Sequence, residues 1–254
     1  MISIRPRLLA FSAVLAGVVL CGGCATPGPT HAYLASRADA PILDILPGAA
    51  NAEVSTYLSS FNELYGLAYD PFTDHLFLRV FPGDFIRVID RPAGKIKRSF
   101  YVAGLPAGPG DLAIRSSDRH LFFAHPTQPA VIETTLYGRI IRTITLDSLS
   151  GAPAGVAYDQ SNDHLLILNG GDLAHVGTYD LSGQRLSGVA LDRNVRLGSL
   201  AYDSKATELY VPLLEDKTIG IFSAQGTLLR TLPAQSADET RFIDVGQRSL
   251  LRLF

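Results

Sequence analysis

Short runs of alternating apolar and polar residues recur along the chain about every 44 residues. The clearest copy of the opening run is Gly66–Asp70, and matching or looser copies begin at Gly110, Gly155 and Gly198. A fixed period of this length is typical of a stacked or radial array of small structural units. The pattern therefore predicts a repeat architecture before it indicates anything about function.

Each unit contains four apolar runs that are rich in Val, Ile, Leu and Tyr. In the first unit a polar turn leads to Leu76–Leu78, and an alternating run follows at Ile86–Asp90. A turn with a glycine follows the third run of every unit, where a hairpin needs a positive φ angle: Gly94, Gly138, Gly183 and Gly226. These runs predict a four-stranded antiparallel sheet of the size of a propeller blade.

The two ends of the chain predict one further unit. Ile42–Gly48 and Val54–Leu58 have the pattern of a third and a fourth strand, whereas Arg241–Val245 and Leu250–Phe254 have that of a first and a second. Joining them would close the ring and protect most strand edges. The sequence thus predicts an all-β propeller of five four-stranded blades over residues 41–254, closed by a blade shared between both termini.

A ring of six blades is the alternative, if Tyr33–Ala35 begins an additional partial unit. Leu67–Leu78 together with Ile86–Asp90 resembles the YVTN and NHL classes of β-propeller repeat, and the likeness extends over roughly residues 40–254. The chain departs from the YVTN pattern at Leu78-Arg79, where a Thr-Asn pair would end the second strand. The resemblance implies the fold and leaves the function open, because propellers include enzymes, binding platforms and scaffolds.

Residues 1–23 predict a signal peptide. Two arginines precede the apolar stretch Leu8–Leu20, which is too short to span a bilayer comfortably. Small residues then lead to Cys24, and this arrangement resembles a bacterial lipoprotein signal. The resemblance implies cleavage before Cys24 and attachment of diacylglycerol and a further fatty acid such as palmitate. An ordinary secretory peptide or an uncleaved anchor is the alternative.

The lipoprotein resemblance also implies a location. Ala25 after the cysteine favours the periplasmic side of the outer membrane, with surface exposure or the inner membrane as alternatives. Residues 24–40 contain two prolines and a glycine and little apolar pattern, so we expect a lipidated, flexible tether that reaches at most about 50 Å. The formal charge is −2 without a basic run, so we expect no nucleic-acid partner.

Three histidines recur at one position of successive units: His75, His120 and His164. Metal ligands must lie within about 2 Å of one ion. Equivalent turns of different blades lie apart around the rim, so these histidines cannot converge on a metal. We expect them to form hydrogen bonds within their own turns.

The loops that differ between units supply the candidate ligand-binding residues, because such loops build the axial face of a propeller. These residues are Glu63, Asp84, Asp111, His125, Asn169, Asp172, His175 and Glu215. Carboxylates, an Asn and a His could together hold Ca²⁺. No spacing fixes such a site, so we expect no cofactor.

The sequence contains no P-loop, serine nucleophile elbow or HExxH motif. We therefore favour a non-enzymatic envelope lipoprotein that serves as a binding platform for a protein or a small ligand. The alternative is a hydrolase like the gluconolactonase-type propellers, in which an axial metal polarises a lactone. A secreted or surface-displayed adhesion module is the third interpretation.

Overall fold

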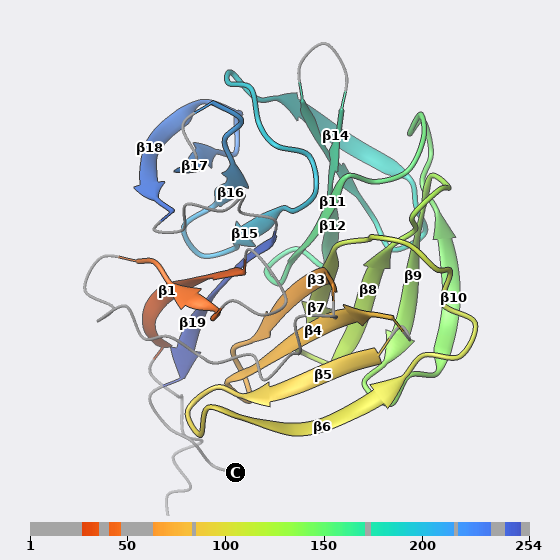
Figure 1. The fold of residues 1–254 in the computed structure, drawn as a ribbon. Coiled ribbons are helices and arrows are strands. Elements are labelled where there is room, and N and C mark those ends of the chain that lie inside the picture. Colours follow the sequence, from red (N-terminus) through yellow and green to blue (C-terminus); the bar gives the residue numbers. More distant parts are fainter. Residues whose placement is uncertain are drawn as a thin grey trace, which may run out of the picture.

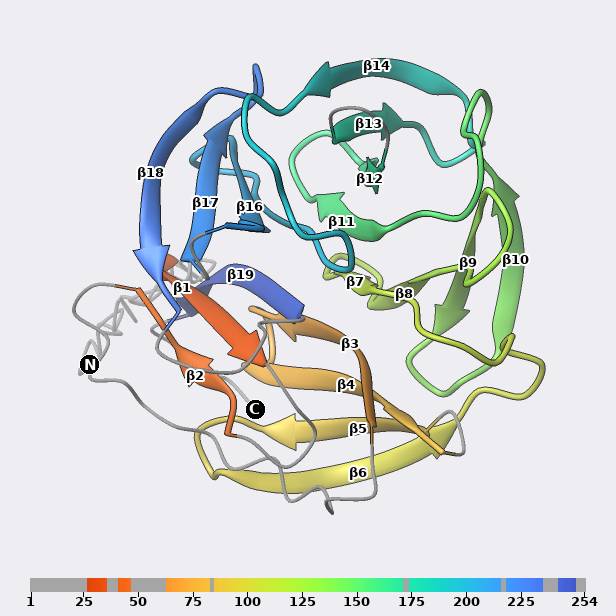
Figure 2. The same ribbon diagram turned by 45° about the horizontal axis from the view of Figure 1, so that its top comes forward.

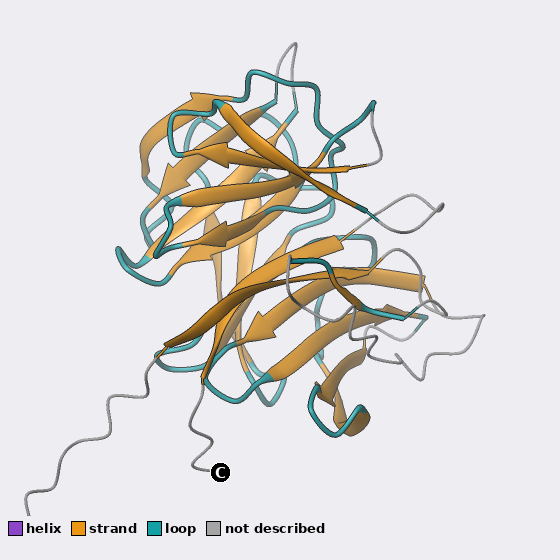
Figure 3. Ribbon diagram, turned by 90° about the vertical axis from the view of Figure 1, so that its left-hand side faces the viewer, coloured by secondary structure: helices purple, strands orange, loops and turns teal. Residues whose placement is uncertain are grey.

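The computed structural model describes residues 27–35, 41–46, 63–82, 85–170, 174–215, 218–234 and 242–249. This part of the chain consists of strands joined by turns and loops (Figure 3). No helix able to cross a membrane is found among these residues.

Four blades each contain four antiparallel strands, as the repeat predicts. Blade 1 has β3 (Glu63–Asp70), β4 (His75–Phe81), β5 (Phe85–Asp90) and β6 (Lys95–Tyr101). Blade 2 has β7 (Leu112–Arg115), β8 (His120–Ala124), β9 (Ala130–Thr135) and β10 (Ile140–Thr145). Blade 3 has β11 (Gly155–Asp159), β12 (His164–Asn169), β13 (His175–Tyr179) and β14 (Arg185–Ala190). Blade 4 has β15 (Ala201–Asp203), β16 (Glu208–Pro212), β17 (Thr218–Ser223) and β18 (Leu228–Pro233).

The fifth blade joins the two ends of the chain. Its described strands are β19 (Phe242–Ser249), then β1 (Pro27–Ala35), then β2 (Leu43–Asp44). The antiparallel pairing of β1 with β19 begins at Pro27 opposite Ser249 and ends at Ala35 opposite Phe242. The five-bladed ring and its closure by a blade shared between both termini are therefore confirmed.

The division of this blade between the termini differs from the prediction. Residues 27–35 form β1, the second strand of this blade. The sequence pattern places these residues in a flexible tether over 24–40 and gives the second strand to Leu250–Phe254. Tyr33–Ala35, which suggested a sixth blade, belong to the same strand. The prolines of β1 lie at its start, where a missing backbone N–H is tolerated. Val54–Leu58 and residues 250–254 lie outside the described residues.

The first strand of each blade lies nearest the centre of the ring, and in blades 1 to 4 the fourth strand lies outside (Figures 1 and 2). The inner strands contact one another in the order β3, β7, β11, β15, β19 and again β3. The opening glycines of the repeat permit this approach. A β-carbon built on Gly66 would lie 3.0 Å from Gly110 O, and one on Gly155 would lie 2.9 Å from Leu200 N.

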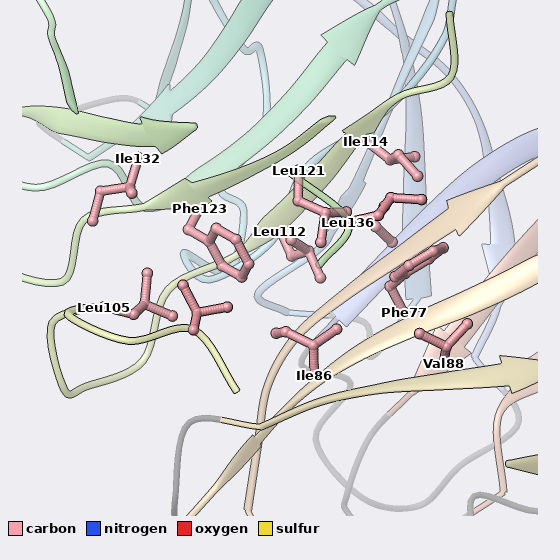
Figure 4. Packing of buried hydrophobic residues seen from close by; sticks show 12 residues of the cluster. Phe77, Ile86, Val88, Leu105, Leu112, Ile114, Leu121, Phe123, Ile132 and Leu136 are labelled. Carbon is pink, nitrogen blue, oxygen red and sulfur yellow. The ribbon is translucent and has the colours of Figure 1, made fainter. Parts of the chain in front are cut away.

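Apolar side chains fill the space between each pair of neighbouring blades. Phe77 and Ile86 of blade 1, for example, pack with Leu112 and Phe123 of blade 2 (Figure 4). Corresponding clusters join the other neighbours around the ring, including blade 5 with blade 1. Because each cluster has residues from two blades, a blade buries its faces only when both neighbours are present.

The glycine turn between the third and fourth strands packs on the preceding blade. Gly183 has φ +91°, and a β-carbon there would overlap Thr145 O at the end of β10. The Gly183 carbonyl also accepts a hydrogen bond from Asp147 N at 2.9 Å. The turn glycines of blades 2 and 4 lie equally close to their preceding blades. The repeated glycine thus serves contact between blades as well as turn geometry.

We predict that Gly183→Ala destabilises the protein by more than Gly94→Ala. Both residues have positive φ, but nothing lies within 4 Å of a β-carbon on Gly94. The strained backbone costs about 1–2 kcal/mol at either position, and the overlap at Gly183 adds about 1–3 kcal/mol. Urea unfolding measures both variants, and equal losses would contradict the packing of this turn on blade 2.

Candidate functional site

The strands connect two faces of the ring. We call the side with the turns from first to second strands the turn face; these turns span 70–75, 115–120, 159–164 and 203–208. The opposite side, the loop face, has the loops that enter each first strand and those that join second to third strands. The predicted ligand-binding residues that the structure describes belong to loop-face segments or strand ends.

Asp111 lies at the centre of the ring. Its Oδ2 accepts hydrogen bonds from Val156 N of blade 3 and from Leu200 N at the entry to blade 4, both at 3.0 Å. Asp111 itself precedes β7 of blade 2, which is not a neighbour of blade 4. A carboxylate from blade 2 that bonds to blade 3 and also to blade 4 can lie only at the axis. The Asp111 side chain is buried there.

Ser199 connects Asp111 to the closing blade. Its Oγ lies 3.2 Å from Asp111 Oδ1 and accepts a hydrogen bond from Ile243 N of β19 at 3.0 Å. Asp111 and Ser199 each stand between the opening glycine of a unit and the leucine that follows. The first and third units have no residue at this position, so both residues are insertions. The two inserted polar residues therefore meet at the axis.

Burial has the largest effect on Asp111 and raises the pKa of its carboxyl well above the ordinary range. Hydrogen bonds from backbone N–H groups oppose the shift, and the carboxylate of Asp244 adds to it. The side chain is thus held by donors from other blades in the interior of the ring. A cation at this place would have to replace those hydrogen bonds, so the geometry favours a structural role for Asp111.

Asp244 holds the seam between the last blade and the first. Its Oδ2 accepts a hydrogen bond from Tyr69 N of β3 at 2.5 Å, and its Oδ1 accepts one from Val245 N at 2.8 Å. Withdrawal of the carboxylate from water raises its pKa to about 7, although these hydrogen bonds oppose the shift. Asp244 gives no signal in the sequence, because it is a lone Asp in a short apolar run.

His125 follows β8 at the loop face and is nearly buried. Its Nδ1 accepts hydrogen bonds from Thr127 N at 3.2 Å and Gln128 N at 3.1 Å. Burial lowers the pKa of His125, and the charge of Arg79 lowers it further. This histidine therefore orders its own loop as a neutral ring.

Arg79 is a buried residue near the loop-face end of β4, and in the sequence it stands out only as a departure from the YVTN pattern. Its Nη2 donates to Pro106 O at 2.8 Å, in the segment that joins blades 1 and 2. The guanidinium carbon lies 6.0 Å from the ring centre of Tyr65 and 5.8 Å from that of Phe123. Arg79 thus joins aromatic side chains of two blades.

The other described candidates are distributed over three blades. Asn169 ends β12 and is paired with His175, the first residue of β13. Glu215 is exposed on blade 4 and accepts a hydrogen bond from Asn194 Nδ2 at 3.3 Å. Glu63 is exposed at the start of β3 in blade 1. The strand pairing brings together only Asn169 and His175 among them, and Cys24, Asp84 and Asp172 lie outside the described residues.

Among the described residues, a group with the composition of a metal centre lies in blade 2. Ligand atoms of Asp118, His120 and Glu133 lie within 4.8 Å of one another in blade 2. Arg115 already donates to Asp118 at 2.6 Å and to Glu133 at 2.8 Å, and Arg142 donates to Glu133 at 2.7 Å. Two guanidinium groups therefore neutralise these carboxylates, and the cluster has the character of an ion-pair network.

His75 bonds within its own turn, as predicted, because its Nδ1 lies 2.7 Å from Thr73 Oγ1. His120 differs in part: its Nδ1 lies 3.2 Å from Asp118 Oδ2 of its own turn but closer, at 2.8 Å, to Glu133 Oε1 of the third strand β9. The aspartates that end the first strands of three units also cap their own turns: Asp70, Asp159 and Asp203. Asp159, for example, accepts from Ser161 N at 2.9 Å and from Asn162 Nδ2 at 2.7 Å.

Apolar side chains are exposed at the loop face. Phe85 is 45% exposed and Tyr101 is 54% exposed, and their rings meet edge to face at 6.0 Å between centres. Phe81, at the end of the neighbouring strand, stacks on Tyr65 at 5.2 Å. Leu197 and Leu214, in loops of blade 4, are exposed as well. This face can therefore bury apolar surface of a partner.

Comparison with solved structures shows the same fold. A chain from the nidogen/laminin complex superposes with a TM-score of 0.60 at 12% identity, over 85% of this chain and 98% of that one. A protein of unknown function from Bacteroides caccae gives a TM-score of 0.56 at 12% identity, over 86% and 99%. No family model matches the sequence, and no curated protein matches it. These likenesses establish a β-propeller repeat protein.

We predict that Asp111→Ala lowers the free energy of unfolding much more than Asp111→Asn. The alanine variant leaves Val156 N and Leu200 N buried without an acceptor, at about 1–3 kcal/mol for each group. The asparagine side chain keeps an oxygen for both donors and removes the buried ionisable group. Urea unfolding near neutral pH compares them, and equal losses would show that the axial hydrogen bonds contribute little.

The raised pKa of Asp244 predicts a dependence of stability on pH. The group has a pKa of about 7 when folded and about 3.9 when unfolded. Its contribution is fully present below about pH 4 and is lost as the pH rises through 7, because the folded state retains the proton longer. The loss is at most about 1.4 kcal/mol per pH unit.

The measurement compares wild type with Asp244→Asn between about pH 4 and 8, so that other titrating groups cancel. The stability of wild type relative to the variant should fall as the pH rises. A difference that stays constant or increases would contradict the raised pKa at the seam.

Proposed function

We propose that the protein is a non-enzymatic binding platform of the bacterial cell envelope, with its loop face as the binding surface. The observation that carries the proposal is the axial carboxylate of Asp111. Its oxygens are engaged by donors from blades 3 and 4, whereas Phe85 and Tyr101 are exposed on the loop face. Polar groups at the axis thus hold the ring together, and apolar groups at its rim face solvent.

The hydrolase interpretation finds less support in this geometry. An axial metal centre needs several oxygen or nitrogen ligands around one ion. The described candidates Glu63, His125 and Glu215 come from three different blades, and the Nδ1 of His125 is occupied by backbone donors. A protein or small ligand that covers the loop face fits the side chains better.

The envelope location rests on the lipoprotein resemblance of residues 1–24. We propose that cleavage leaves Cys24 as the lipidated first residue, on the periplasmic side of the outer membrane. The likeness of the repeats to the YVTN and NHL classes belongs to this proposal too, since such propellers include binding platforms.

Photocrosslinking tests the binding surface in cells. We expect a benzoylphenylalanine at position 85 or 101 to form an adduct with the partner. The same residue at position 229 is the matched control, because Leu229 is 51% exposed on the outer strand β18. Adducts of the same partner from position 229 would contradict the proposal. It would also be contradicted if positions 85 and 101 gave no adduct and native mass spectrometry detected no retained ligand.

Chelation serves as the control for the hydrolase alternative. A metal held only by the native state would stabilise it by about 2.7 kcal/mol at a hundredfold excess over Kd. In a domain of this size each kcal/mol moves Tm by about 2–4 °C. We expect no resolvable shift with EDTA. A drop of several degrees that Ca²⁺ restores and Glu63→Gln reduces would favour the hydrolase.

A further inference from the structure

The N-terminal end of β1 lies at the turn face. Pro27 is paired with Ser249, which is the last residue of β19 and lies at the turn-face end of that strand. Thr30 Oγ1 donates to Asp203 Oδ2 at 2.8 Å, and Asp203 begins the turn from β15 to β16. The chain that precedes β1 therefore reaches the ring at the turn face of blade 5.

Pro27 stands three positions after Cys24, with only Ala25 and Thr26 between them. A fully extended chain of three residues spans at most about 11 Å, in contrast to the tether of about 50 Å that the sequence pattern predicts. The eight residues of β19 correspond to roughly 26 Å from one face to the other. An acyl chain on Cys24 would consequently hold the turn face close to the bilayer and the loop face well away from it.

The turns beside this end of β1 expose side chains that suit a bilayer surface. Phe72, in the first turn of blade 1, is 59% exposed. Its neighbour Pro71 lies against β19, since a β-carbon on Gly246 would be 3.6 Å from Pro71 Cβ. On the other side, Lys205 is exposed in the turn that Thr30 contacts. An aromatic ring and a lysine are typical of contacts with acyl chains and anionic headgroups.

We propose that the turn face lies on the bilayer surface, with Phe72 and Lys205 in contact with lipid, and that the loop face points into the aqueous space. The proposal rests on the lipidation of Cys24 that forms part of the proposed function. It assigns each face one role, because the face that binds the membrane is opposite the face offered to the partner.

Two labelled variants of blade 2 test this orientation. Ser117→Cys places a fluorophore on the turn face and Thr127→Cys places one on the loop face; both residues are exposed and lie at opposite ends of β8. The only cysteines of the chain are Cys21 and Cys24. Cleavage removes the first and acylation blocks the second, so each introduced thiol is unique.

The lipidated variants are bound to phosphatidylethanolamine and phosphatidylglycerol vesicles that contain a lipid with a nitroxide on its headgroup. We expect the probe at position 117 to be quenched at least twofold more than the probe at 127. Equal quenching, or stronger quenching at 127, would overturn the orientation. Cys24→Ala, which lacks the acceptor of the lipid, is the reference that does not float with the vesicles. A protein with Cys24 intact that also fails to float would overturn the lipidation itself.

A further variant tests the cause of the orientation. Twenty Gly and Ser residues inserted after Ala25, combined with Phe72→Ser and Lys205→Gln, should abolish the difference between the two probes while the protein still floats. A difference that persists would show that neither the short connection nor these side chains orient the protein, and would overturn the proposal.

Discussion

The hydrogen bonds of the Asp111 carboxylate are the constraint on which the rest of the ring depends. They join blade 2 to blades 3 and 4 across the axis, and Ser199 extends the connection to β19. A carboxylate in the interior is costly unless donors surround it. Backbone N–H groups at the entries to inner strands supply those donors, so one side chain fixes how closely the blades approach. The same bonds engage the group that a metal centre at the axis would require.

Closure of the ring determines where an anchor that precedes β1 would be attached to the propeller. The second strand of the closing blade, β1, comes from the N-terminal segment and pairs with β19 from the other end of the chain. A cluster of charged and polar side chains binds the three described strands of this blade together. Asp44 of β2 lies 2.6 Å from His31 of β1 and accepts from Arg248 of β19, which also donates to Tyr33 at 2.7 Å. An anchor on the preceding residues would therefore be attached to the framework itself.

The repeat predicts the four regular blades because their signals are local. Each hairpin depends on a glycine or capping aspartate within a few residues, as at Asp159 and Gly183. The pattern predicts the closing blade only in part, because most of the pairing of β1 is with residues more than 200 positions away. Its proline-rich start is typical of a linker. The axial role of Asp111 could have been found from the extra residue after Gly110, which Ser199 repeats after Gly198.

Native-state hydrogen exchange tests the axial account most directly. The amides of Tyr69, Val156 and Leu200 donate to the carboxylates of Asp244 and Asp111. If these bonds hold the ring, the three amides exchange only when the whole protein unfolds, with the free energy of global unfolding. Exchange of Val156 and Leu200 at the rate of exposed loop amides, while the strand interiors stay protected, would contradict the central place given to Asp111.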